Sequence, residues 1–176
     1  MFAAHFAAGL ALRTARSSPP TATLLVGAFL PDFIWIALAG LGWDKAGSPT
    51  ASDAWSHSVA SILVLGVVYA TVALPRGSHR GRLLLFAAVL SHLFLDALIH
   101  PQPIELFPTA ALRATWNLWP WGQERQLLGF TNYFVLQAAV TAALAGIYAL
   151  RARLAGIGRA GVRATLAALA FVHLVT

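Results

Sequence analysis

Apolar runs alternate with short polar or basic links along the whole chain. Within each run Leu, Ala, Val, Ile and Phe occupy every face of a helical period, without the two-residue alternation of a half-buried strand. A helix needs about 20 such residues to cross a hydrocarbon core of about 30 Å. The pattern predicts an all-α fold, a polytopic membrane helix bundle of about five to six helices. We expect a single transmembrane helical domain over residues 1–176, with apolar segments Phe2 to Ala15, Thr21 to Trp43, Trp55 to Leu74, Leu83 to His100, Phe130 to Leu150 and Ala164 to Thr176.

Breaks in the pattern refine this prediction. The first segment is too short to cross a bilayer unaided, so we expect it to be short or partly inserted. Pro31 and Asp32 are expected to interrupt the second segment, because proline cannot donate a helical hydrogen bond. Pro101 is expected to end the fourth. The stretch 101–129 that follows is a candidate lid, and it carries three tryptophans of the kind that favour a membrane–water boundary: Trp116, Trp119 and Trp121.

Composition supports a membrane protein. The chain is 59% hydrophobic and 10% charged, whereas soluble domains are usually about 45–50% apolar and about 25% charged. The net charge of +6 lies in the links between apolar runs, so we interpret the basic residues as topology signals and expect no nucleic acid partner. The absence of cysteine excludes disulfides and thiolate metal sites. Any metal must use His, Asp, Glu and water, which suits zinc or a similar divalent ion.

The basic residues predict an orientation. If segments two to five all cross, nine of the 12 Lys and Arg residues fall on one side, which the positive-inside rule makes cytoplasmic. The polar residues inside the apolar runs then lie in the outer half of the bilayer. The nine are Arg13, Arg16, Arg76, Arg80, Arg82, Arg151, Arg153, Arg159 and Arg163, and the other three are Lys45, Arg113 and Arg125.

Candidate chemistry begins at the end of the fourth segment. His92, Asp96 and His100 are spaced four residues apart, so on a helix they form one polar stripe on an otherwise apolar surface. A carboxylate in such a setting needs a partner, because an unpaired polar group in an apolar medium costs several kcal/mol. No Lys or Arg lies within any predicted span to supply one. A metal ion would satisfy all three side chains.

Three further polar residues can reach the same depth: His5, Asp32 and His57. Each also has an ordinary interpretation. A lone intramembrane histidine is often only a hydrogen-bonded packing residue, and Asp32 is equally open to interpretation as a cap after Pro31. Together with His92 and Asp96, in a chain with almost no other intramembrane polar groups, they indicate a metal site.

The predicted roles follow from ligand chemistry. His57, His92 and Asp96 are expected to bind a divalent ion and leave one position for water. His5 and His100 are candidates to hold a second ion, with Asp96 bridging. Asp32 is the candidate catalytic base, or an outer residue that orients a ligand. The neighbouring Ser56, Ser58 and Ser91 are candidates to hydrogen-bond an imidazole, or are small packing residues.

Several of these motifs resemble a known family. The chain contains His5-x3-Gly9, Pro31-Asp32, Ser56-His57-Ser58, Ser91-His92-x3-Asp96, Pro103 and Leu106-Phe107-Pro108. This set resembles the YdjM-like membrane-bound metal-dependent hydrolases of the bacterial inner membrane, over roughly residues 1 to 108. Two features depart from that family's pattern. Ile34 stands where a second Asp is frequent. The stretch Ser52-Asp53-Ala54-Trp55 lacks the His-Arg pair that is frequent ahead of Thr-His-Ser, and Ser56 replaces the Thr.

The order His, Asp, His, His-x3-Asp is also similar to the zinc set of zinc-dependent phospholipase C and its nuclease relatives. The resemblance implies His57, His92 and Asp96 on one zinc, Asp32 as base, and His5 with Asp96 on a neighbouring zinc. It also implies a bacterial inner-membrane location.

Three functions stay open on the sequence alone. The first is a membrane-embedded hydrolase that cleaves a lipid-like phosphoester or ester by metal-activated water, with membrane lipid or a lipid-linked molecule as partner. Arg113 and Arg125 would then hold a head group, or act only as interfacial anchors. The second is a non-catalytic metal-binding or ion-transport protein. The third is a scaffold whose metal only ties helices together.

Overall fold

The computed structural model describes residues 2–13, 19–42, 54–99, 104–108, 115–116 and 129–175. These residues form seven helices and one antiparallel pair of short strands. In chain order the elements are α1 (Phe2–Ala11), α2 (Thr21–Gly40), α3 (Ala54–His57), α4 (Val59–Ala73), α5 (His79–Ile99), β1 (Ile104–Glu105), β2 (Thr115–Trp116), α6 (Gly129–Leu154) and α7 (Arg159–Val175). The prediction of an all-α fold is confirmed.

Three helices are long and apolar enough to cross a membrane, by length and composition: Thr21–Gly40, His79–Leu98 and Phe134–Leu154. Helix α4 is apolar but shorter, with 15 residues, and its length of about 22 Å falls below the core of about 30 Å. Helix α1 has 10 residues, as expected for a short first segment. The sequence predicted four crossing segments, and three of them meet the length condition.

The predicted continuous helix from Trp55 to Leu74 is wrong at one point, because Ser58 divides it into α3 and α4. Ser58 has an extended backbone with ψ of 152°, and its hydroxyl accepts a hydrogen bond from the Ser61 amide at 3.2 Å. A serine in this role caps a new helix. The break at Ser58 makes α3, which carries His57, a helix separate from α4.

The opposite correction applies at Pro31, where an interruption was predicted. Helix α2 runs unbroken from Thr21 to Gly40 with Pro31 fully buried inside it. The ring of a mid-helix proline removes one hydrogen bond, and packing against neighbouring helices compensates. Asp32 therefore lies on a regular helical surface rather than at a helix end.

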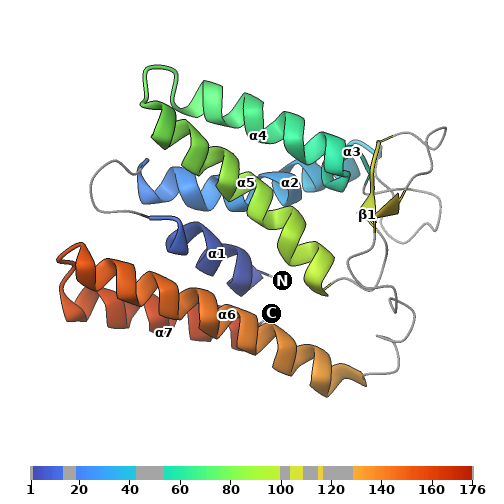
Figure 1. Ribbon diagram of the computed structural model, residues 1–176. Helices are drawn as coiled ribbons and strands as arrows, with labels where there is room; N and C mark the ends of the chain where they lie inside the picture. The colour runs from blue at the N-terminus through green and yellow to red at the C-terminus, as the bar shows by residue number, and fades with distance from the viewer. Residues whose placement is uncertain are drawn as a thin grey trace.

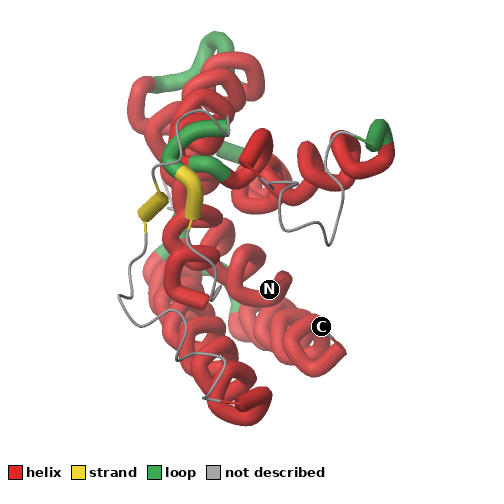
Figure 2. Tube along the Cα trace, turned by 90° about the vertical axis from the view of Figure 1, so that its right-hand side faces the viewer, coloured by secondary structure: helices red, strands yellow, loops and turns green. Residues whose placement is uncertain are grey.

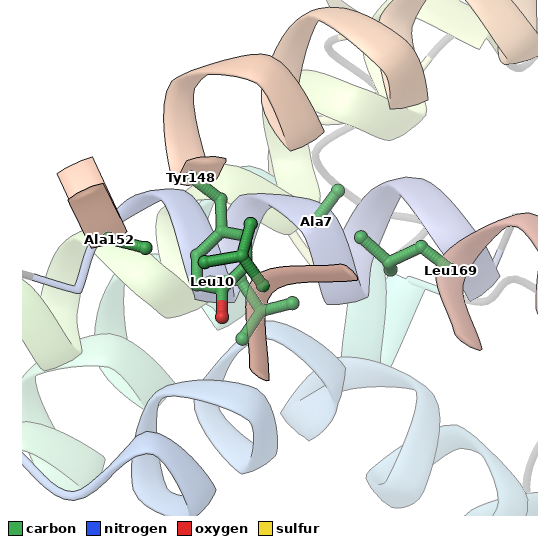
Figure 3. Close-up of a cluster of buried hydrophobic side chains, with 6 residues drawn as sticks. Ala7, Leu10, Tyr148, Ala152 and Leu169 are labelled. Atoms are coloured by element: carbon green, nitrogen blue, oxygen red, sulfur yellow. The ribbon is translucent and has the colours of Figure 1, made fainter. Parts of the chain in front are cut away.

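Helix α1 lies in the middle of the molecule (Figure 1). It contacts α2 and α5 on one side and α6 and α7 on the other. Helix α5 in turn packs against α2 and α4. The side view shows the helices at the two chain ends, α1 and α7, next to each other (Figure 2). One buried cluster joins α1 to the hairpin, and Figure 3 labels five of its six members, Ala7, Leu10, Tyr148, Ala152 and Leu169, with Val162 completing it. The central helix α1, with 10 residues, is thus held from two sides.

The α6–α7 turn follows from a glycine. Gly156 has a positive φ of 74°, and the Ile157 amide bonds back to the Ala152 carbonyl at 2.9 Å. This is the Schellman ending of a helix, which favours glycine because a side chain is strained there. The sequence predicted that the last helix begins near Ala164, but α7 begins at Arg159. Arg159 therefore lies at the start of α7, and Arg151 and Arg153 lie at the end of α6.

The described arginines gather at one end of the bundle. The C-terminal end of α1, the N-terminal end of α2, and the α4–α5 and α6–α7 connections all lie on the left in Figure 1. The opposite end carries α3 and the strand pair, in which Ile104 pairs with Trp116 and Glu105 with Thr115. The arginines of the first end are Arg13, Arg76, Arg80, Arg82, Arg151, Arg153, Arg159 and Arg163.

Close helix packing yields a stability prediction at Gly66. A Cβ added there would lie 2.8 Å from the Phe86 ring on α5, whereas a Cβ at Gly146 on α6 meets nothing within 4 Å. We expect Gly66→Leu to destabilise the protein by about 1–3 kcal/mol through overpacking. Gly146→Leu is the matched control and should unfold close to the wild-type temperature in the same detergent. Equal unfolding temperatures for the two variants would contradict this packing.

Candidate metal centre

Five of the six predicted site residues converge between the helices. His5 comes from α1, Asp32 from α2, His57 from α3, and His92 and Asp96 from α5. The sixth, His100, lies outside the described residues, as do the loop residues Arg113 and Arg125. Segments far apart in sequence therefore bring three imidazoles and two carboxylates into one cluster, and these residues are able to hold a metal ion.

Asp96 lies at the centre of this cluster. Its Oδ2 is 3.1 Å from His92 Nε2 and 3.9 Å from His57 Nε2. Its Oδ1 is 3.5 Å from His5 Nε2. The two oxygens thus face different histidines, as a bridging or orienting carboxylate requires.

Asp32 approaches the same two nitrogens, Nε2 of His57 and Nε2 of His92. Its Oδ1 is 3.3 Å from His57 Nε2 and 3.7 Å from His92 Nε2. Bonds of about 2.0–2.2 Å to a tetrahedral ion place neighbouring ligand atoms about 3.3–3.6 Å apart. The N–O separations of 3.1–3.9 Å bracket that spacing. Asp32, His57 and His92 form one group able to hold an ion, and Asp96 lies beside it.

The orientation of His92 is set by the backbone of α2. Its Nδ1 donates a 2.8 Å hydrogen bond to the Ala28 carbonyl, which can only accept. In a neutral ring this leaves the lone pair on Nε2, facing Asp96 Oδ2 at 3.1 Å. His92 Nε2 is buried and has no hydrogen-bond partner. A lone pair directed at a carboxylate oxygen is repulsive unless a cation or a proton lies between them.

Among the three serines proposed as imidazole partners, one takes that role. Ser56 Oγ lies 2.7 Å from His57 Nδ1, which leaves His57 Nε2 directed at Asp32. Ser58 instead caps α4, and Ser91 donates to the Ala88 carbonyl of its own helix at 2.7 Å. The ordinary interpretation therefore applies to Ser91, and Ser58 acts by forming the helix break.

His5 is fixed by ring contacts. It stacks on His92 with ring centres 4.1 Å apart and planes 6° from parallel, and it meets the edge of Phe29 at 5.7 Å. Two stacked imidazolium ions would repel, so this geometry suits neutral rings. His5 Nδ1 is buried without a hydrogen-bond partner, while its Nε2 faces Asp96.

The charge of the cluster favours a divalent ion. With neutral imidazoles, two carboxylates approach the same pair of nitrogens in a poorly solvated interior, and such like charges need compensation. In the described structure every ion pair involves a histidine and an aspartate of this cluster. The described arginines lie at the other end of the bundle. A dication would balance both carboxylates.

The ligand groups overlap rather than forming two separate sites. One group is Asp32, His57 and His92, and the other is His5, His92 and Asp96. His92 is common to both, yet its ring has one free lone pair because Nδ1 is committed to Ala28. A second ion beside His5 would have only His5 and Asp96 among the described residues. The predicted second ion stays a prediction, and the geometry favours one ion.

Exposure defines an open side. The side chains of Asp32 and His57 are 24% and 21% exposed, whereas those of His5 and His92 are 2% and 1% exposed. Asp96 is intermediate at 12%. The cluster is therefore closed toward α1 and reachable from the α2–α3 side.

One determinant of the site had no signal in the sequence pattern. The Ala28 carbonyl belongs to an unremarkable apolar run, and its role depends on how α2 and α5 pack.

Comparison of the chain with protein-family models, with curated proteins and with solved structures gives no match, so the resemblance to YdjM-like membrane-bound metal-dependent hydrolases stays a prediction.

Proposed function

We propose that the protein is a membrane-embedded, metal-dependent hydrolase that cleaves a lipid-like phosphoester or ester. The single observation that supports this most is that Asp96 Oδ2 lies 3.1 Å from His92 Nε2 and 3.9 Å from His57 Nε2, while Asp32 lies beside both nitrogens on the open side. Two imidazoles and a carboxylate with an accessible fourth position are typical of catalytic rather than structural zinc sites.

In this proposal His57, His92 and Asp96 hold the ion, most simply zinc. Ala28 and Ser56 fix the two imidazoles through their other ring nitrogens, as outer partners of zinc ligands commonly do. His5 holds the second oxygen of Asp96. When bound, a divalent ion would lower the pKa of water toward about 7 and polarise a phosphoryl or carbonyl oxygen.

Asp32 is the proposed base. Of the two carboxylates it is the more exposed, and it lies on the open side of the cluster. A carboxylate in hydrogen-bond reach of the nucleophilic water accepts its proton as the water attacks. Asp32 Oδ1 lies 3.3 Å from His57 Nε2, so the base would lie beside this ligand atom and beside water on the ion.

The surroundings of the open side favour an amphiphilic substrate. Ile36 lies one helical turn from Asp32 and is 57% exposed, and Trp55, two residues before His57, is 50% exposed. Phe33, next to Asp32, is 51% exposed. A molecule with an apolar chain and a scissile ester head would bury these side chains while its head reaches the ion.

The predicted orientation completes the proposal. The arginine end would face the cytoplasm of a bacterial inner membrane by the positive-inside rule. The opposite end, with α3 and the cluster, would then face outward. A lipid of the outer leaflet could approach the site sideways.

Ion transport is the alternative from another class, and the packing argues against it. Between the cluster and the arginine end the described helices meet through the apolar residues Leu24, Ala70, Leu85 and Ala88. A transport pathway needs polar groups along its length. The described histidine–aspartate cluster lies instead beyond this apolar layer, toward α3.

The proposal is tested with purified protein in nanodiscs, supplied with phospholipids and polyprenyl phosphates. Zinc-loaded protein should hydrolyse one of these substrates, chelation should stop turnover, and added zinc should restore it. His57→Ala should bind zinc more weakly and lose turnover. Tight zinc binding with no hydrolysis of any substrate in either class would reject the enzyme and leave a binding protein or scaffold.

A further inference from the structure

Helix α1 carries His5 but has little means of holding its own position. It has 10 residues, no acidic residue in its first turn and no basic residue in its last. Isolated helices shorter than about 12–15 residues are marginal in water even with favourable sequences. The placement of His5 therefore depends on what α1 packs against.

One contact at the far end of α1 comes from α6. Arg151 donates a hydrogen bond from Nη1 to the Ala11 carbonyl. Ala11 is the last residue of α1, where carbonyls have no partner within the helix and a cation is favoured by the helix dipole. One turn earlier on α6, Tyr148 packs against Leu10 (Figure 3). Arg151 and Tyr148 thus both contact the last turn of α1, one through a hydrogen bond and the other through apolar packing.

This contact is coupled to the metal cluster through the helix itself. Ala11 and His5 are six residues apart, about 9 Å along a helix that moves as a unit. His5 depends on placement of that order, because its Nε2 lies 3.5 Å from Asp96 Oδ1 and its ring stacks on His92. A small displacement of the α1 end would therefore separate His5 from Asp96.

We propose that Arg151 is a positioning residue of the metal centre: by holding the end of α1 it keeps His5 against Asp96. The inference rests on the proposed cation site, although Arg151 itself touches neither the ion nor the open side. This inference gives the α6–α7 hairpin a role in the metal centre, although no residue of α6 or α7 belongs to either ligand group. The ordinary alternative is that Arg151 is only one of the interfacial arginines at this end.

The test is a double-mutant cycle on zinc affinity, measured by chelator competition in nanodiscs. Arg151→Met removes the charge and the donors at similar length, and we expect it to weaken zinc binding about fivefold, less than the about 10–100-fold seen for direct outer partners of a ligand. Arg151→Lys should recover affinity to within about twofold of wild type. In the His5→Ala background, Arg151→Met should have no further effect, because residues that act through one another are not additive.

Arg153→Met is the matched control, since Arg153 lies two residues on, is exposed, and its side chain makes no hydrogen bond in the described structure. Wild-type affinity in Arg151→Met, or an equal loss with and without His5, would overturn the inference. If Arg151→Met does not fold, Arg151→Gln carries the same comparison. Failure of the wild-type protein to bind zinc would instead reject the proposed function, so the two failures are distinguishable.

Discussion

Replacing Asp96 with alanine is expected to abolish tight divalent-ion binding. Among the residues that the structure describes, Asp96 is the one whose oxygens approach all three histidines of the cluster, at 3.1 Å, 3.5 Å and 3.9 Å. Loss of even an outer partner of a metal ligand typically costs about 10–100-fold in affinity, so loss of this residue should cost more than about 100-fold. Metal analysis of the purified variant, together with chelator competition for zinc, measures the effect.

Two companion variants make this result specific. Glu105→Gln removes the carboxylate of β1, which belongs to neither ligand group, and should bind zinc as the wild type does. His92→Ala should lose affinity like Asp96→Ala, because His92 belongs to both groups. Unchanged zinc content in Asp96→Ala, with the fold retained, would end the interpretation of this cluster as a metal centre.

Replacing Asp32 with asparagine should separate binding from turnover. The amide keeps the size of the carboxylate but cannot accept the proton of an attacking water. General acid–base groups typically contribute about 10²–10⁴-fold, so kcat should fall within that range while zinc stays bound. Steady-state hydrolysis of the substrate found by the nanodisc assay, beside zinc content measured on the same sample, checks both parts.

The outcome for Asp32→Asn also distinguishes the remaining functions. A scaffold would keep its fold and its metal, and would have no turnover to lose. Loss of zinc together with turnover would make Asp32 a ligand, which its 3.3 Å and 3.7 Å distances to the two Nε2 atoms permit, and would leave the base unassigned.

Much of the fold could be predicted from the sequence because apolar runs of helical length have few alternatives in lipid. A backbone in a hydrocarbon core must satisfy its own hydrogen bonds, so an apolar run of about 20 residues becomes a helix. Helices α2, α5 and α6 follow this rule, and the short α1 also follows from its length. Two helix boundaries differ from the prediction: Ser58 divides one predicted helix, and Pro31 does not divide another. Both outcomes depend on local hydrogen bonds and on packing that composition does not express.

The candidate site divides in the same way. The sequence by itself determined which residues needed a partner, since His5, Asp32, His57, His92 and Asp96 are costly inside an apolar bundle and no basic residue lies near them along the chain. Only the tertiary structure decided that they meet at one point, that the Ala28 carbonyl turns His92 toward Asp96, and that Arg151 bonds to the last carbonyl of the helix that carries His5. The physical reason is that the need for a partner is a property of one side chain in its medium. The identity of the partner is a property of how separate helices pack.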